Sequence, residues 1–150
     1  MKNPVVIVGA GLSGLRAASL LAAQGIECKV IEAKERIGGR VLSTSDPDRP
    51  DIGTFDLGPT WFWPQYEKTI TSLVKELNVG TFDQYNKGAM LSERTKNLPP
   101  ERFVLPENAG ERSVRIQGGV QSLIDAVANT VPPGVVELET RVTAIRLDEH

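Results

Sequence analysis

The sequence predicts an α/β fold in which helices flank a parallel sheet, and three observations near the N-terminus support this. Residues 5–8 form an unbroken β-branched run, which is typical of a strand buried on both faces of a parallel sheet. Small apolar residues then follow with helical spacing from Leu12 and stop at Gly25. A second strand is expected over residues 27–31. Strand, helix and strand in this order predict parallel pairing of the two strands.

Three glycines join the first strand to the helix, and each has a physical role. Gly9 permits a tight turn, Gly11 allows the backbone to approach a diphosphate, and Gly14 lets the helix pack on the strand. The open N–H groups at the helix N-terminus would face the anion. Glu32 ends the second strand, where a carboxylate can accept hydrogen bonds from a ribose. A glycine turn without a ligand is the alternative, but the order of the elements favours dinucleotide binding.

Composition narrows the class of protein. The chain has 150 residues, 40% of them hydrophobic and 24% charged, and a net charge of −2. These values predict one ordinary domain and no electrostatic attraction to nucleic acid or anionic membranes. No apolar run is long enough to span a bilayer, and the first one breaks at Gly9, unlike a signal peptide. Cys28 is the single cysteine and His150 the single histidine, so we expect a structural thiol, no metal site and a cytoplasmic, reducing location.

Two further segments carry candidate site residues. Gly38 and Gly39 lie between Arg36 and Arg40, which indicates either a second phosphate-approach loop or a solvated turn with surface arginines. A short strand at 54–57 leads into Gly58 and Pro59, followed by the aromatic run Trp61-Phe62-Trp63. This run is either ordinary core or the wall of a site for a flat ligand, against which the glycine turn brings the backbone.

The remaining chain alternates between polar turns and short elements. A polar loop without a packing pattern is expected at 43–53, a helix at 65–77 with Asn78 as its C-cap, and an antiparallel insertion made of strands 81–85, 88–91 and 102–105. A helix follows Gly118-Gly119 over 120–128, and strands are expected at 135–138 and 142–147. Because the last strand has no following partner, we expect the chain to be a fragment.

These segments together resemble the flavin-containing amine oxidases. Residues 32–40 are similar to the E-A-x-x-R-x-G-G-R signature for FAD, residues 56–61 to the D-x-G segment that lies along the flavin, and residues 116–119 precede a helix as in that family. The resemblance implies a Rossmann-like FAD-binding domain with an antiparallel β insertion, part of a larger two-domain flavoprotein. Residues 1–60 would bind the dinucleotide, 65–110 would begin a substrate-side insertion, and 111–150 would return to the FAD domain.

The same resemblance implies the contacts with FAD. The three N-terminal glycines would hold the diphosphate, Glu32 the adenosine ribose, Arg40 a phosphate or ribityl oxygen, and the Val142 peptide groups the adenine edge. Residues 58–61 would border the isoalloxazine. The expected cofactor contacts are Gly9, Gly11, Leu12, Ser13, Gly14, Glu32, Ala33, Arg36, Gly38, Gly39, Arg40, Gly58, Pro59, Thr60, Trp61 and Val142.

The implied activity is oxidation of a small amine to an imine, by hydride transfer to flavin N5 and reoxidation by O2 to H2O2. No catalytic side chain is visible, and the family places such groups beyond residue 150, so the piece alone is expected to be inactive. Which amine is oxidised and the oligomeric state stay open. The alternatives are a related flavin desaturase or protoporphyrinogen oxidase-like enzyme, or a non-catalytic FAD- or nucleotide-binding module.

Overall fold

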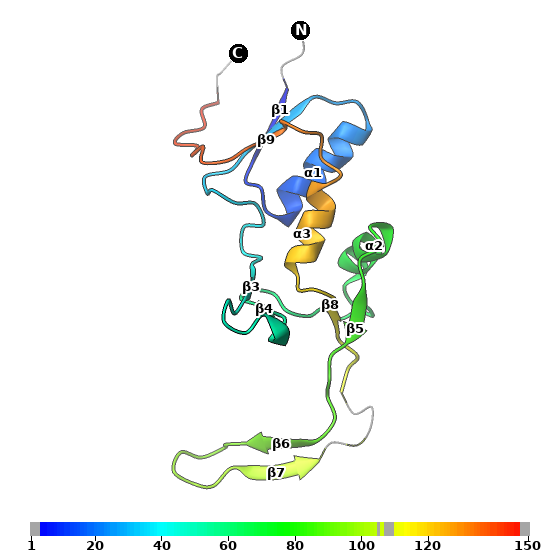
Figure 1. Cartoon of the computed structure of the whole chain (residues 1–150), viewed down its shortest axis with the longest axis vertical. Helices are drawn as coiled ribbons and strands as arrows, with labels where there is room; N and C mark the ends of the chain where they lie inside the picture. The colour runs from blue at the N-terminus through cyan, green and yellow to red at the C-terminus, as the bar shows by residue number, and fades with distance from the viewer. Residues whose placement is uncertain (1–3, 105, 107–109, 148–150) are drawn as a thin grey trace.

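A parallel sheet and two helices form the main packed unit of the fold (Figure 1). The computed structural model describes residues 4–104, 106 and 110–147. Within them, β1 (Val5–Val8) pairs in parallel with β2 (Cys28–Ile31), and β2 pairs in parallel with β9 (Val136–Glu137). Helices α1 (Leu12–Ala23) and α3 (Gln121–Ala128) pack against each other. The α/β, Rossmann-like class predicted from the sequence is confirmed.

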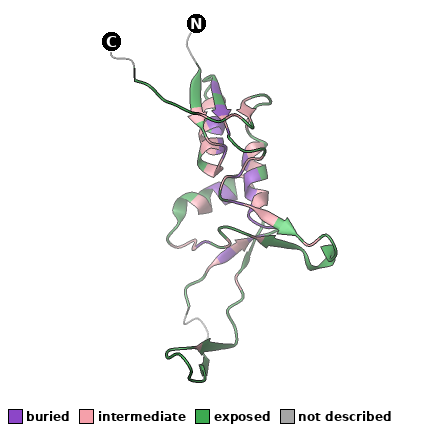
Figure 2. Ribbon diagram, turned by 90° about the vertical axis from the view of Figure 1, so that its left-hand side faces the viewer, coloured by how far each residue is buried: buried purple, intermediate pink, exposed green. Residues whose placement is uncertain are grey.

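The core lies where α1, α3 and the sheet meet, and Figure 2 shows the buried residues gathered there. Leu15, Val30, Leu123, Ile124 and Val127 are fully buried within it. The small residues of α1 allow this close helix packing. Cys28 is also buried, and its thiol donates to the Ala18 carbonyl at 3.8 Å, as expected of a structural cysteine. Within the described residues, no helix combines the length and apolar character needed to cross a bilayer.

The expectation that residues 5–8 are buried on both faces is wrong for this chain. β1 forms an edge of the three-stranded sheet, and Val6 and Val8 are 54% and 58% exposed. Ile7 faces α1, since its Cγ2 would lie 3.3 Å from a Cβ placed on Gly14. The β-branched run correctly predicts a parallel strand, but burial of the second face needs a covering element that the described residues do not supply.

A small antiparallel pair replaces part of the polar loop expected at 43–53. β3 (Ser43–Ser45) pairs with β4 (Thr54–Asp56), and a 3-10 turn, η1 (Pro50–Ile52), lies between them. The strand at β4 was predicted. β3 was missed because its three short polar residues show no apolar alternation and depend on β4 for their pairing.

Helix α2 (Lys68–Glu76) begins three residues later than the sequence predicts. The chain turns at residues 64–66 first, and the Glu67 carboxylate accepts a hydrogen bond from the Trp63 N–H at 2.7 Å. The C-cap of α2 is Leu77, whereas the sequence predicts Asn78 in that role. Asn78 is the next residue and has a φ of 52°.

The predicted antiparallel insertion is present, but only two of its three predicted strands pair with each other. β6 (Ala89–Ser92) and β7 (Glu101–Val104) form a hairpin that projects from the rest of the chain and is mostly exposed (Figures 1 and 2). β5 (Thr81–Asp83) pairs instead with β8 (Val114–Ile116), a strand that the sequence analysis did not predict. Leu105, the predicted end of the third strand, lies outside the described residues.

The strand expected at 142–147 is absent. These residues have no regular structure, and Ile145 and Leu147 are exposed. Alternating apolar residues favour a strand only where a neighbouring strand supplies hydrogen bonds, and none lies beside them within the described part of the chain. β9 occupies the middle of the predicted strand 135–138. Asp148, Glu149 and His150 lie outside the described residues.

We expect Gly14→Ala to destabilise the chain. Its Cβ would lie 2.0 Å from the Gly9 carbonyl oxygen, so α1 must shift away from β1. Overpacking of this kind costs about 1–3 kcal/mol, which urea denaturation measures. Gly11→Ala is the matched control, because its Cβ would meet no described atom within 4 Å apart from those of its chain neighbours. Its free energy of unfolding should stay within about 0.5 kcal/mol of the wild type. Equal losses in both variants would contradict this packing.

Candidate dinucleotide site

The site is built around the turn between β1 and α1. Gly9 has a φ of +101°, a conformation that favours glycine, and its N–H donates to the Ile31 carbonyl at 2.8 Å. Gly11 is the N-cap of α1, and the first intrahelical bond runs from the Leu15 N–H to the Gly11 carbonyl at 3.0 Å. Because Gly11 has no side chain, it offers no side-chain acceptor to the N–H groups of residues 12–14, which follow it. They form a positive helix end that suits an anion.

A second glycine loop lies directly against the first. The Gly38 N–H donates to the Ala10 carbonyl at 2.8 Å, and Gly38 and Gly11 form an isolated parallel β-bridge. A Cβ on Gly39 would lie 3.3 Å from the Gly11 Cα. Because the two backbones touch, the residues that the sequence analysis placed in two separate phosphate-approach loops form one continuous surface.

This surface lines a cavity of about 1030 Å³. Ten of the predicted site residues line it: Gly9, Gly11, Leu12, Ser13, Gly14, Gly38, Gly39, Arg40, Gly58 and Pro59. Val8, Lys34 and Val41 also line it and were not predicted. Of these, Lys34 carried a signal in the sequence, since it is a cation within the motif 32–40. Predicted residues that do not line this cavity are Glu32, Ala33, Arg36, Thr60, Trp61 and Val142.

Glu32 is buried beside the turn, with 7% of its surface exposed. Its Oε2 accepts the Ala10 N–H at 2.8 Å, and its Oε1 accepts the Lys34 N–H at 2.9 Å. The Ala10 N–H, followed by the Lys34 N–H, lowers the pKa of Glu32 below its ordinary value. The carboxylate is therefore ionised at neutral pH. Its predicted contact with a ribose stays a prediction.

The two arginines of the second loop have different environments. The Arg36 guanidinium donates to the carbonyls of Ile37 at 3.0 Å, Gly39 at 3.0 Å and Val41 at 3.2 Å. It therefore stabilises the loop from within, and its predicted contact with a phosphate stays a prediction. Arg40 is exposed and lines the cavity, and its predicted contact with an anion likewise stays a prediction.

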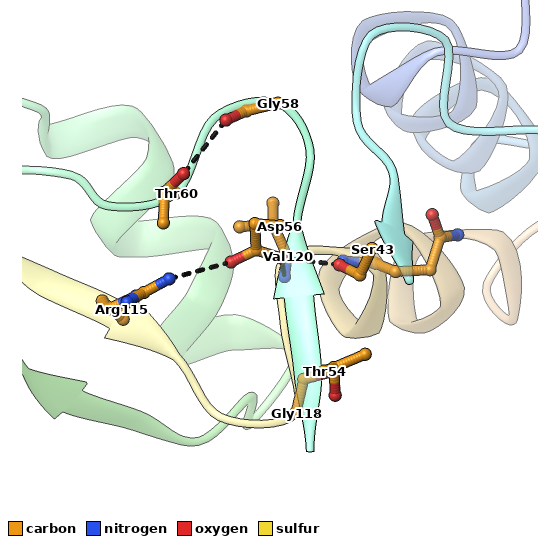
Figure 3. Close-up of polar contacts among 9 residues, drawn as sticks. Ser43, Thr54, Asp56, Gly58, Thr60, Arg115, Gly118 and Val120 are labelled. Carbon is orange, nitrogen blue, oxygen red and sulfur yellow. Dashed lines mark hydrogen bonds and ion pairs between the residues drawn. The ribbon is translucent and has the colours of Figure 1, made fainter. Parts of the chain in front are cut away.

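Gly58 is required by the second loop rather than by the space of the cavity. A Cβ at this position would lie 2.4 Å from the Arg40 carbonyl oxygen. The sequence analysis expects the glycine at position 58 to let the backbone approach a flat ligand. In the structure, the backbone that it lets approach is that of Arg40. The Thr60 hydroxyl donates to the Gly58 carbonyl at 3.0 Å and stabilises the turn (Figure 3).

The aromatic run divides between core and cavity wall. Phe62 is buried, whereas Trp61 is 49% exposed and packs edge-on against Trp63, with 6.5 Å between ring centroids. A second cavity of about 250 Å³ lies beside Trp61 and Phe62 and shares Leu12, Val41 and Pro59 with the first. The core interpretation therefore applies to Phe62, and Trp61 stands at the rim of an apolar space.

Asp56 has a structural role beside the site that the sequence did not reveal. Its side chain is 3% exposed and accepts hydrogen bonds from the Ser43 hydroxyl at 2.6 Å and the Val120 N–H at 2.8 Å (Figure 3). Arg115 lies 3.6 Å from its other oxygen. Asp56 thus joins β3, β4, β8 and the start of α3, and fixes the strand end from which residues 57–61 leave. Its partners are distant in sequence, so no local pattern revealed them.

Comparison with known proteins places this site in a class. The NAD(P)-binding Rossmann-like domain family matches residues 7–77. Putrescine oxidase of Kocuria rosea is 36% identical over 88 residues, which cover 59% of this chain and 17% of that protein. Flavin-containing amine oxidase B of Homo sapiens is 39% identical over 83 residues, or 54% of this chain and 15% of that protein. The chain thus spans only a small part of these relatives' lengths.

Solved structures agree in fold. Putrescine oxidase bound to putrescine superposes with a TM-score of 0.75 over 93% of this chain and 51% of that chain, at 18% identity. A double mutant of putrescine oxidase gives a TM-score of 0.58 and 32% identity over 71% of this chain and 22% of that chain. The fold and the glycine loops define a Rossmann-like dinucleotide-binding domain. Within that class, the chain is similar in sequence to amine oxidases, among them flavin-containing amine oxidase B, over a short part of their length.

We expect Arg36→Gln to lower the free energy of unfolding by about 1.5–3 kcal/mol, because hydrogen bonds from a charged donor to the loop carbonyls are lost. Arg40→Gln is the matched control at the exposed arginine and should change stability by less than about 0.5 kcal/mol. Chemical denaturation of the two variants measures both values. Similar effects of the two substitutions would show that Arg36 does not stabilise the loop.

Proposed function

We propose that this chain is the FAD-binding beginning of an amine oxidase. Residues 1–60 bind the dinucleotide, residues 65–110 begin a substrate-side insertion, and residues 111–150 return to the FAD domain. The observation that carries the proposal is the cavity of about 1030 Å³ between two touching glycine loops, at an uncapped helix N-terminus. Similarity in sequence to flavin-containing amine oxidases supports FAD as the ligand.

The residues present fit such a ligand. A diphosphate needs close backbone approach and positive charge, and a Cβ on Gly11 would meet open space, so the bare glycine leaves room for it. The N–H groups of residues 12–14 would bind the diphosphate, with the cations of Lys34 and Arg40 at the same cavity. Glu32 would accept from the adenosine ribose, and its negative charge disfavours a ribose 2′-phosphate, which argues against NADP.

The flavin end would lie toward residues 58–61. Gly58 and Pro59 line the large cavity, and Pro59, Thr60 and Trp61 line the adjoining apolar cavity. An apolar wall of this kind excludes water and orients an amine substrate beside a planar ring. The Val142 peptide groups would pair with the adenine edge.

The chemistry that bound FAD supplies in such an oxidase is acceptance at flavin N5 of a hydride from the carbon beside the amine, with O2 then reduced to H2O2 and the amine left as an imine. The chain's own residues bind and orient the cofactor. The substrate is a small amine and the second substrate is O2. We expect the 150-residue piece alone to be inactive as an oxidase, because no catalytic side chain is recognised in it.

Two measurements on the intact gene product test the function. Titration of apo-protein with FAD, followed by flavin fluorescence, should show saturable binding. Aliphatic and aromatic amines should then drive H2O2 production by the loaded protein, measured with a peroxidase-coupled assay. FAD binding without peroxide from any amine would favour a non-catalytic flavin-binding module or a flavin desaturase. Absence of FAD binding would overturn the proposal.

Substitution of Trp61 should affect turnover more than folding. Trp61 is half exposed at the rim of the apolar cavity, so in the intact protein Trp61→Ala should retain FAD and change kcat or KM for amines. Phe62→Ala is the matched control, because truncation of a buried aromatic costs about 3–5 kcal/mol of stability. Thermal melts, flavin content and amine kinetics on both variants separate the two roles. A Trp61→Ala protein that melts far lower yet turns over normally would return Trp61 to ordinary packing.

A further inference from the structure

The Ala10 peptide, at the centre of the glycine turn, is held from both sides. Its N–H donates to Glu32 Oε2 at 2.8 Å, and its carbonyl accepts the Gly38 N–H at 2.8 Å. Ala10 itself is fully buried. The turn carries no side chain at Gly9 or Gly11 that could fix its conformation. Together with the bond from the Gly9 N–H to the Ile31 carbonyl, these two hydrogen bonds hold the turn that orients the following N–H groups.

Glu32 is in turn fixed by its own backbone. Its N–H donates to the Glu137 carbonyl at 2.8 Å, and its carbonyl accepts the Thr140 N–H at 2.8 Å. The second carboxylate oxygen binds the Lys34 N–H at 2.9 Å. The carboxylate is thus a rigid acceptor placed by β2 and β9, and each of its oxygens already has a backbone donor.

We infer that Glu32 is a positioning residue for the glycine turn, and that it strengthens diphosphate binding through the Ala10 peptide independently of any contact with ribose hydroxyls. This inference rests on the proposed dinucleotide function and deepens it. A charge-assisted bond on the Ala10 N–H holds the turn in the conformation that presents the N–H groups of residues 12–14 to the anion. The depressed pKa of Glu32, whose largest cause is the Ala10 N–H, agrees with this coupling.

A ligand pair separates positioning from ribose recognition. ADP and 2′,3′-dideoxy-ADP share the diphosphate, and only ADP has the ribose hydroxyls that Glu32 would bind. Their affinities for the intact gene product are measured by titration calorimetry in the wild type, Glu32→Ala and Glu32→Gln. Glu35→Gln is the control, because Glu35 is an exposed carboxylate three positions away. FAD titration of the same wild-type protein tests the proposed function separately.

We expect Glu32→Ala to weaken both ligands by about tenfold to a hundredfold, the range for loss of a charge-assisted hydrogen bond. Glu32→Gln should weaken both ligands by less, since its amide retains one acceptor, and Glu35→Gln should change neither. A loss for ADP with no loss for 2′,3′-dideoxy-ADP would overturn the inference and leave Glu32 as a ribose ligand. This outcome is compatible with normal FAD binding by the wild type, so it differs from failure of the proposed function.

Amide hydrogen exchange gives a readout without ligand. In Glu32→Gln, the Ala10 N–H should exchange at least about tenfold faster, because its charged acceptor is replaced by a neutral one. The amides of Val30 and Ile124, which lie in the core, should keep their wild-type protection. Unchanged protection at Ala10 would overturn the inference even if no nucleotide bound. Loss of protection at all three positions would show a global effect and would also count against it.

Discussion

The contact between two glycine-containing loops is the constraint on which the rest of the site depends. Ala10 and Gly38 are joined by a backbone hydrogen bond, and Gly39 stands against Gly11 with no side chain between them. Gly58 extends the same arrangement, since its backbone meets that of Arg40. Three separate segments therefore converge through main chain alone. A side chain on Gly39 or Gly58 would push these segments apart and open the cavity that they line.

The sequence predicted those parts of the fold that local pattern determines. The glycines, the helix α1 and the parallel pairing of β1 with β2 follow from spacing within thirty residues. Errors fall where structure depends on distant partners. β3 exists because it pairs with β4. Among the residues that the structure describes, none forms a strand beside 142–147 and none covers the second face of β1. Periodicity describes what a segment favours, and a sheet forms only where a partner is present.

The candidate site follows the same division. The glycines and Arg40 were predicted and line one cavity. Spacing could not reveal that Arg36 folds back onto loop carbonyls, because the choice between two neighbouring arginines depends on where those carbonyls point. Asp56 was likewise hidden, since its hydrogen-bond partners are 13 and 64 positions away. The charged side chains of Glu32, Arg36 and Asp56 thus form hydrogen bonds with backbone groups. The burial of Glu32 and of the Asp56 side chain, and the partial burial of Arg36, are tolerated because those bonds replace hydration.

The position of β1 at the edge of the sheet affects the behaviour of this polypeptide in solution. Within the described residues, the backbone groups on the outer side of β1 have no neighbouring strand, and one face of the strand, which includes Val6 and Val8, is exposed. Such an edge is a template for strand addition by another molecule, and no proline interrupts Val5–Val8, although Pro4 directly precedes them. We therefore expect the 150-residue chain to self-associate as its concentration rises and to refold poorly after denaturation, whereas a polypeptide in which this edge is paired internally would do neither.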